Sequence, residues 1–217
     1  MAEQPNILVI WGDDIGISNL SCYSDGLMGY RTPNIDRLAE EGMRFTDFYA
    51  GCTVCAPSRC VLMTGYHMGH CYVRGNAGQK DRSIQILRDQ DVTVAEVLKK
   101  AGYATALCGK WGLGEEGSIG VPNKQGFDHF FGYLNQHHAH NYYPAYLFQN
   151  ENRYPLKNIV PGEGDFGRGV ASEKVDYSPG LITAEALKWV EQYKDRPFFL
   201  YYAPTLPHAN NEGGKEG

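Results

Sequence analysis

Residues 55–65 (CAPSRCVLMTG) are the stretch of the sequence that most restricts the local structure the chain can form. Pro57 has a fixed φ and no backbone N–H, properties that suit the first turn of a helix and no interior position. We therefore expect Cys55 to stand just before a helix, at the positive end of the helix dipole.

The same helix end offers groups that bind an oxyanion. Backbone N–H groups of a first turn have no partner within the helix, and Arg59 lies one turn after Cys55, from where it can fold back. The alternative is a buried or helix-capping cysteine, with Arg59 on a solvated face. The neighbouring residues favour a site for sulfate or phosphate.

Asp13 and Asp14 follow a short apolar run, residues 6–11 (NILVIW). This run predicts a buried central strand that ends at Gly12. Ligands collect at the C-terminal edges of parallel strands, and paired carboxylates suit a hard divalent cation. An ordinary acidic turn is the alternative.

Composition excludes several classes of protein. The chain has 217 residues, 42% of them hydrophobic, which is enough for one domain with its own core. A formal net charge of -5 without a basic cluster argues against nucleic acid as a partner. No apolar stretch reaches membrane-spanning length, and no signal peptide is recognisable at the start, so either the protein is cytoplasmic or a leader has been removed.

Six cysteines permit disulfides without requiring them. The pair Cys52-x-x-Cys55 has the spacing of a redox or zinc pair. No second Cys/His pair stands at zinc-finger spacing and no thioredoxin-like pattern surrounds it, so we do not favour this interpretation.

The apolar pattern predicts alternating helices and strands along the rest of the chain. Thr32 and Pro33 begin a helix that Gly42 ends, and a capping box of Thr93 and Glu96 begins another. The other predicted elements are strands at 43–49, 102–111 and 198–202, and a helix whose apolar face carries Ile182, Ala186, Trp189 and Tyr193. Residues 150–179 are predicted to form a long excursion that shapes a substrate cleft, and no element is predicted after Asn210.

Residues 55–65 resemble the sulfatase motif Cys-x-Pro-Ser-Arg followed by an apolar stretch and Thr-Gly, whose cysteine is oxidised to formylglycine during biosynthesis. Asp13 and Asp14 resemble a sulfatase strand end where both side chains bind calcium, and residues 32–36 (TPNID) resemble the helix after that loop. The resemblance implies a metal site made by Asp13, Asp14 and the modified Cys55, with calcium bound and magnesium as the alternative.

Residues 109–111 (GKW) resemble the second sulfatase motif, in which the lysine contacts sulfate, although a lysine at a strand end is usually only solvated. His208 matches a substrate-binding histidine in a Pro/Thr-rich turn. Gly112 departs from the family pattern, which often has a histidine here beside formylglycine. The base that helps regenerate the aldehyde therefore differs, and His137 is a candidate.

Three histidines, His137, His138 and His140, follow residues 125–133 (QGFDHFFGY), which resemble an arylsulfatase segment. They could bind a transition metal, line the substrate pocket or lie in a surface loop. His137 is nearest in register to a pocket histidine of related enzymes, so we expect it to bind substrate.

The resemblance implies an α/β fold: an alkaline phosphatase-like sandwich whose central, mostly parallel sheet is flanked by helices. It covers residues 1–217 as the N-terminal portion of a sulfatase catalytic domain, so we expect a truncated chain that is inactive alone. Family members are periplasmic, secreted or lysosomal, and the formylglycine-generating enzyme is the implied maturation partner.

The implied activity is hydrolysis of an aryl or carbohydrate sulfate ester. Cys55, Arg59, Lys110 and His208 are the expected catalytic residues, while Lys110, His137 and His208 bind substrate. A phosphoesterase of the same superfamily, and a non-catalytic remnant with an anion site, are the alternatives.

Overall fold

The computed structural model describes residues 4–77, 83–162 and 169–216. The chain divides into two compact units, Asp14–Ala50 and the larger unit made by Met1–Asp13 with Gly51–Gly217. Each unit is described by itself.

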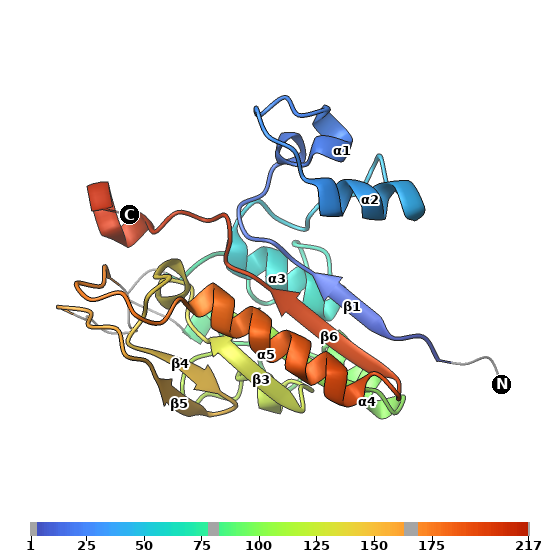
Figure 1. Ribbon diagram of the computed structural model, residues 1–217. Helices are drawn as coiled ribbons and strands as arrows, with labels where there is room; N and C mark the ends of the chain where they lie inside the picture. Colours follow the sequence, from blue (N-terminus) through green and yellow to red (C-terminus); the bar gives the residue numbers. More distant parts are fainter. Residues whose placement is uncertain (1–3, 78–82, 163–168, 217) are drawn as a thin grey trace. The chain divides into compact units, whose positions relative to one another are not determined.

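The larger unit is built on a six-stranded sheet in the order β1-β6-β2-β3-β4-β5 (Figure 1). Its first four strands in this order are parallel, and β4 and β5 continue the sheet as an antiparallel hairpin. The strands are β1 Ile7–Ile10, β2 Ala104–Lys110, β3 His129–Tyr133, β4 Tyr146–Gln149, β5 Asn152–Pro155 and β6 Phe198–Ala203. The predicted mostly parallel sheet is thus confirmed.

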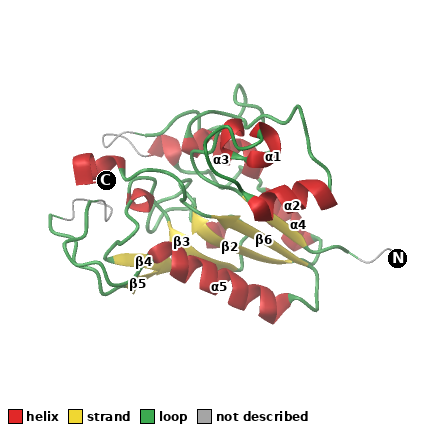
Figure 2. Cartoon of the chain, turned by 45° about the horizontal axis from the view of Figure 1, so that its top comes forward, coloured by secondary structure: helices red, strands yellow, loops and turns green. Residues whose placement is uncertain are grey.

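Helices cover both faces of the sheet (Figure 2). The α-helices are α3 Cys55–Thr64, α4 Val94–Lys100 and α5 Ser178–Tyr193. Short 3-10 helices are η2 Ser83–Gln85, η3 Pro122–Lys124, η4 His138–His140 and η5 Asn211–Glu216. No helix in the described part of the chain combines the length and apolar character needed to cross a membrane.

Strand β2 shows how the two cores arise, because its successive side chains point to opposite faces. Leu107 packs into the core under α3 and α4, whereas Ala106 and Cys108 pack into the core under α5. Both cores are buried, which explains why this strand reads as a continuous apolar run in the sequence.

The helices predicted after Thr93 and around residues 182–193 are confirmed. Thr93 and Glu96 form the capping box of α4, with Thr93 N donating to Glu96 Oε2 at 2.8 Å and Glu96 N donating to Thr93 Oγ1 at 3.2 Å. Helix α5 buries Ile182, Ala186 and Trp189, which recur at helical spacing and therefore face the sheet together.

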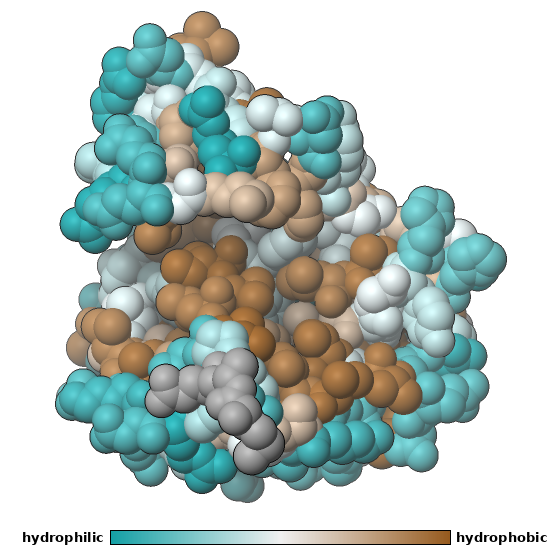
Figure 3. Space-filling model, turned by 90° about the vertical axis from the view of Figure 1, so that its right-hand side faces the viewer, coloured by the Kyte–Doolittle hydropathy of each residue, from teal (hydrophilic) through white to brown (hydrophobic). Residues whose placement is uncertain are grey.

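Strand β1 is at the edge of the sheet, so the prediction of a central strand is wrong. Ile7 and Val9 pack on the core, but Leu8 and Ile10 remain 53% and 56% exposed. Within the described residues, β1 pairs with β6 alone, and α5 contacts β2, β3 and β6. Hydrophobic residues gather on the face of the molecule that includes this edge (Figure 3).

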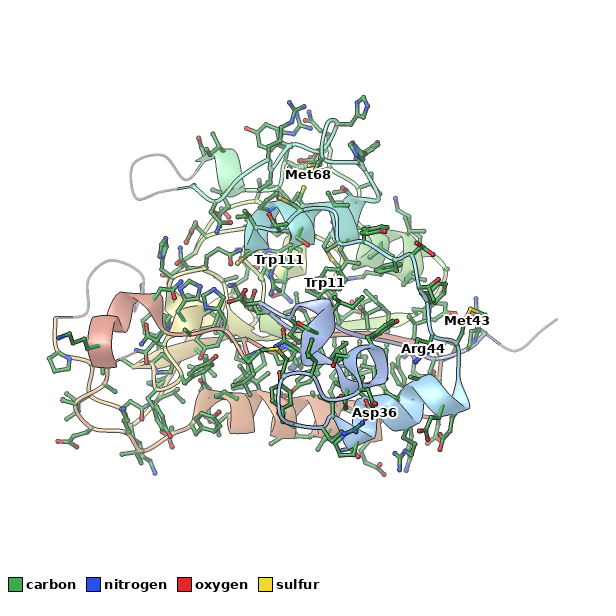
Figure 4. The ribbon with its side chains drawn as sticks, turned by 90° about the horizontal axis from the view of Figure 1, so that it is seen from above. Trp11, Asp36, Met43, Arg44, Met68 and Trp111 are labelled. Carbon is green, nitrogen blue, oxygen red and sulfur yellow. The ribbon has the colours of Figure 1, made fainter. Side chains whose placement is uncertain are left out.

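The smaller unit contains η1 Ile17–Asn19, α1 Ser21–Ser24 and α2 Pro33–Glu41. Asp36 of α2, labelled in Figure 4, accepts hydrogen bonds from Ser21 Oγ at 2.5 Å and Thr32 Oγ1 at 2.9 Å. Thr32 precedes the helix as predicted, but its side chain bonds Asp36 and accepts from Ser21 N instead of capping a backbone N–H of α2.

The strand predicted at 43–49 is wrong. These residues have no strand assignment, and Arg44 donates to Cys22 O at 2.5 Å while Phe45 O accepts from Tyr23 at 2.7 Å. Apolar and polar residues alternate here as in a strand, but the backbone carbonyl of Phe45 accepts from the Tyr23 side chain of α1. A strand requires a neighbouring strand to satisfy its backbone, and pattern alone does not supply one.

Two further predictions need correction. Part of the excursion at 150–179 belongs to the sheet as β5, and Ile159 forms an isolated bridge with Glu173. Residues 163–168 of that excursion lie outside the described residues. The end of the chain carries η5 after Asn210, where no element was predicted, because a short 3-10 turn needs no apolar periodicity.

Replacing Trp189 by alanine should lower the free energy of unfolding by about 3–5 kcal/mol, because the indole fills the core between α5 and the sheet. Its ring stacks on Tyr193 and meets Phe198 edge-on. Leu187→Ala is the matched control, since Leu187 is on the same helix but 66% exposed. Urea unfolding of both variants checks this, and equal losses would contradict the assigned helix face.

Candidate functional site

The ends of three parallel strands bring distant residues together. Strands β1, β6 and β2 are neighbours and run in one direction, so their C-terminal ends share one edge of the sheet. Asp13 follows β1, and its N–H donates to Leu206 O at 3.3 Å in the loop after β6. Lys110 is the last residue of β2.

A compact charge cluster forms at this edge. Lys110 Nζ lies 2.5 Å from Asp13 Oδ2, and Arg59 Nη2 lies 3.6 Å from the same oxygen. Arg59 Nη1 donates to Lys110 O at 2.6 Å and to the Tyr201 hydroxyl at 3.2 Å. All three charged side chains are buried. The cluster therefore combines two cationic groups with one carboxylate.

The cluster shifts the pKa values of its members. Burial alone would raise the pKa of Asp13, but the Lys110 ammonium and the Arg59 guanidinium outweigh it and hold that pKa below its usual value. Burial lowers the pKa of Lys110, and Arg59 adds to this effect against the opposing carboxylate of Asp13. Two of the guanidinium nitrogens, Nε and Nη2, have no hydrogen-bond acceptor among the described residues.

Helix α3 positions the other members of the site. It begins at Cys55 itself, one residue earlier than expected, with Val54 in an extended conformation before it. Cys55 is close enough to Lys110 that a thiolate there would favour the ammonium form of the lysine. Trp111 lies beside α3 and packs in the same core (Figure 4). Arg59 is anchored on β2 and β6 through Lys110 O and the Tyr201 hydroxyl, contacts that its position one turn after Cys55 did not predict.

Gly109 explains how Lys110 reaches Asp13. Its φ is +128°, and a Cβ at this position would lie 2.0 Å from Ala203 O on β6. Only glycine permits this close approach of the two strand ends. Backbone packing between β2 and β6 thus requires glycine at position 109, just before Lys110.

His208 and His140 form the second part of the site. Their rings stack 4.1 Å apart at an interplanar angle of 8°. His208 Nδ1 lies 2.6 Å from Ala209 O, and since a carbonyl only accepts, Nδ1 carries the proton and Nε2 remains for a ligand. The Tyr142 hydroxyl also donates to His208 O.

His137 and His140 are two of the three histidines that the sequence offered as candidates to line a pocket, and His137 was the one expected to bind substrate. The two rings lie 6.0 Å apart. A spacing of three residues brings side chains together in a 3-10 turn, and η4 His138–His140 provides that turn. The spacing was thus a usable signal once the turn was known.

His138 points into an aromatic environment between Tyr133 and Tyr146, at ring distances of 5.0 and 4.5 Å. Burial lowers the pKa of His138 to about 3, so it is neutral at ordinary pH. Among the described residues, no group of three or more His, Cys, Asp and Glu side chains is placed to hold a metal ion. A site made by all three histidines therefore has no support.

The predicted calcium ligands are of the kind that calcium takes, but the same finding means that Asp13, Asp14 and Cys55 form no group placed to hold a metal among the described residues. Asp13 offers carboxylate oxygen at a strand end, and Asp14, which follows it, adopts φ +63°, a left-handed conformation that is uncommon for a residue other than glycine. Calcium takes about six to eight oxygens. Asp13, Asp14 and an oxygen on residue 55 would supply only part of that shell.

Comparisons with known proteins identify the family of this chain. The family model described as Sulfatase matches residues 5–215. Human arylsulfatase A is 36% identical over 99% of this chain and 43% of its own length. The chain therefore spans less than half of that relative.

Solved structures show the same fold. A chain from Bacteroides thetaiotaomicron, described with the metabolism of multiple glycosaminoglycans, has a TM-score of 0.75 at 28% identity, covering 98% of this chain and 53% of that one. Another, in complex with its substrate D-glucosamine-2-N,6-O-disulfate, has a TM-score of 0.71 at 29% identity, covering 95% and 35%. The fold is the alkaline phosphatase-like sandwich, and the chain belongs to the sulfatase family.

Proposed function

We propose that this chain supplies part of the active site of a sulfatase that hydrolyses sulfate esters through a formylglycine made from Cys55, with calcium. The buried pairing of Arg59 and Lys110 against a single carboxylate, Asp13, carries the proposal. Buried charge is costly unless it is balanced, so the surplus positive charge favours a bound anion.

The open guanidinium atoms of Arg59 suit the oxygens of a sulfuryl group. Nε and Nη2 are buried and lack acceptors among the described residues, while Nη1 is fixed on β2 and β6. A preorganised donor of this kind stabilises charge that develops on an oxyanion without reorganising. Lys110 adds a second positive charge from the end of β2.

The proposal assigns the remaining roles as follows. His208 gives a proton to the departing alcohol or phenol when Nε2 carries one as well as Nδ1, and the Tyr142 hydroxyl bonds its backbone carbonyl. His137 contributes to substrate binding from the same loop as His140. The formylglycine, when present, supplies two geminal hydroxyls, one for attack on sulfur and one for release of sulfate. Its maturation enzyme would be a partner.

Asp13, Asp14 and the modified residue 55 would hold calcium, with magnesium as the alternative, and the metal would add positive charge beside the sulfuryl oxygens. Asp14 enters this set from its sequence position after Asp13. The relative bound to a disulfated glucosamine supports a carbohydrate sulfate as substrate. An aryl sulfate remains the other candidate substrate.

Replacing Arg59 by alanine in the protein that contains this chain should lower the turnover of a sulfate ester by on the order of 10²-fold or more, as for other charge-stabilising donors. Cys55→Ala should abolish turnover, because it removes the nucleophile. Arg37→Ala is the control, since Arg37 is an exposed arginine that pairs only with Glu41 at 3.9 Å.

Mass spectrometry checks the chemistry at residue 55. Conversion of the cysteine to formylglycine lowers the mass of its peptide by about 18 daltons, as the thiol is replaced by an aldehyde. An unmodified Cys55, from a host that has the modifying enzyme, would favour a phosphoesterase or a non-catalytic anion site instead.

Asp14→Asn should weaken calcium binding and lower turnover together, and added calcium should partly restore the rate. Asp25→Asn is a matched control, because the backbone of Asp25 also has a left-handed conformation, with φ +51°. Calorimetric titration with calcium and elemental analysis measure the effect. Stoichiometric zinc without calcium in the active protein would contradict the proposed metal and support the phosphoesterase.

Asp13→Asn should destabilise the metal-free protein by about 3–5 kcal/mol at neutral pH, because Lys110 and Arg59 lose their buried partner. The folded-state pKa of Asp13 lies below its ordinary value of 3.8, so its stabilisation is present above that value. The stabilisation is lost as the pH falls through the lowered pKa. Urea unfolding from pH 7 to 3 in EDTA should therefore show a constant difference that narrows only at the acidic end.

A further inference from the structure

Gly112 lies two residues after Lys110, and the space for a side chain there is already filled. Its φ is +78°, and a Cβ on residue 112 would lie 1.8 Å from Gln136 Nε2 and 2.6 Å from Gln136 Cδ. Gln136 comes from the loop between β3 and η4. Residues 112 and 136 thus share one volume, which the glutamine occupies.

The carboxamide of Gln136 has a fixed orientation. Gln136 Nε2 donates to Gly112 O at 3.2 Å, and reversing the amide would place Oε1 against that same acceptor. The side chain is only 3% exposed. Its Oε1 is buried and receives no hydrogen bond from any residue that the structure describes.

Gln85 offers an internal comparison. Its Nε2 donates to the same carbonyl, Gly112 O, at 3.0 Å, and its Oε1 accepts from Ala77 N at 2.7 Å. Gln85 is therefore satisfied at both ends and holds the loop. Gln136 makes the first of these contacts but has an open acceptor, which a purely structural role does not explain.

The loop that carries Gln136 touches the candidate site at two points. Gln136 bonds the residue two positions beyond Lys110, and His140, four residues after Gln136, stacks on His208 at 4.1 Å. The open Oε1 is thus on a segment that links the cationic cluster with the histidine pair.

We infer that Gln136 is a binding residue of this site, whose Oε1 accepts a hydrogen bond from a hydroxyl group of the bound reactants. The inference rests on the proposed function. A sulfate ester oxygen has no proton to donate, so the partner is a hydroxyl, either on a hydrated residue 55 or on a sugar substrate. Gly112 is the residue that leaves room for this glutamine.

The test compares Gln136→Met with Gln85→Met in the protein that contains this chain. Methionine keeps the length of the side chain and removes both polar groups. We expect Gln136→Met to retain the thermal stability of the wild type within a few degrees, because it removes an unpaired buried acceptor along with one hydrogen bond. Gln85→Met should melt at a clearly lower temperature, since it loses both hydrogen bonds.

Turnover separates a binding role from a structural one. Gln136→Met should lower kcat/KM by about tenfold, the value of one hydrogen bond, while Gln85→Met changes kcat/KM less at a temperature where both are folded. The substrates are 4-nitrophenyl sulfate, which has no hydroxyl, and glucosamine 6-sulfate. A lower kcat/KM with both substrates places the donating hydroxyl on residue 55. A lower kcat/KM with the sugar alone places that hydroxyl on the substrate.

Wild-type kcat/KM for Gln136→Met with both substrates would overturn the inference and leave the proposed function intact. Destabilisation equal to that of Gln85→Met would also overturn it, and Gln136→Ala repeats the comparison if the methionine variant does not fold. Absence of turnover by the matured wild type with either ester would overturn the proposed function itself, and the inference with it.

Discussion

One buried carboxylate, Asp13, balances two buried cations where three parallel strands end. Lys110 comes from the end of β2 and Arg59 from α3, so the cluster forms only when the strand order β1-β6-β2 is in place. Removing the carboxylate leaves two buried positive charges that have neither a counter-charge nor hydration, which is strongly destabilising. In the proposed function, the same excess of positive charge binds the anionic group, so the interaction that holds three segments together would also serve the chemistry.

Some features could be predicted from the sequence because they depend on neighbouring residues alone. The capping box of Thr93 and Glu96 and the start of α3 near Pro57 are local, and the structure has both. The apolar face of α5 is equally local, since its period sets which residues meet the sheet. The resemblance of residues 55–65 to a sulfatase motif identified the family for the same reason, because the motif is continuous in the chain.

Other features depend on which segment lies alongside, and sequence pattern does not contain that information. Residues 6–11 and 43–49 both have strand-like patterns, yet only the first finds a partner, and it does so at an edge. Arg59 could be placed near Cys55 along the helix, but its contacts with Lys110 O and Tyr201 require the folded sheet. His140 could not be told apart from the two other candidate histidines, and Gln136 was not singled out, because their significance lies in what they touch: His208 and Gly112.

Gly112 shows why residues of a family site cannot be assigned one position at a time. Considered alone, it is the loss of a histidine, and the sequence suggested that His137 compensates. In the structure the volume at residue 112 is filled from another segment, by a carboxamide that does not titrate, and the role of His137 as the base stays a prediction. A side chain at residue 112 would have to displace Gln136 and adopt a left-handed backbone, so residue 112 cannot gain a side chain unless residue 136 changes as well. The function of a site should therefore be inferred from all the residues that fill it together, and not from one sequence position at a time.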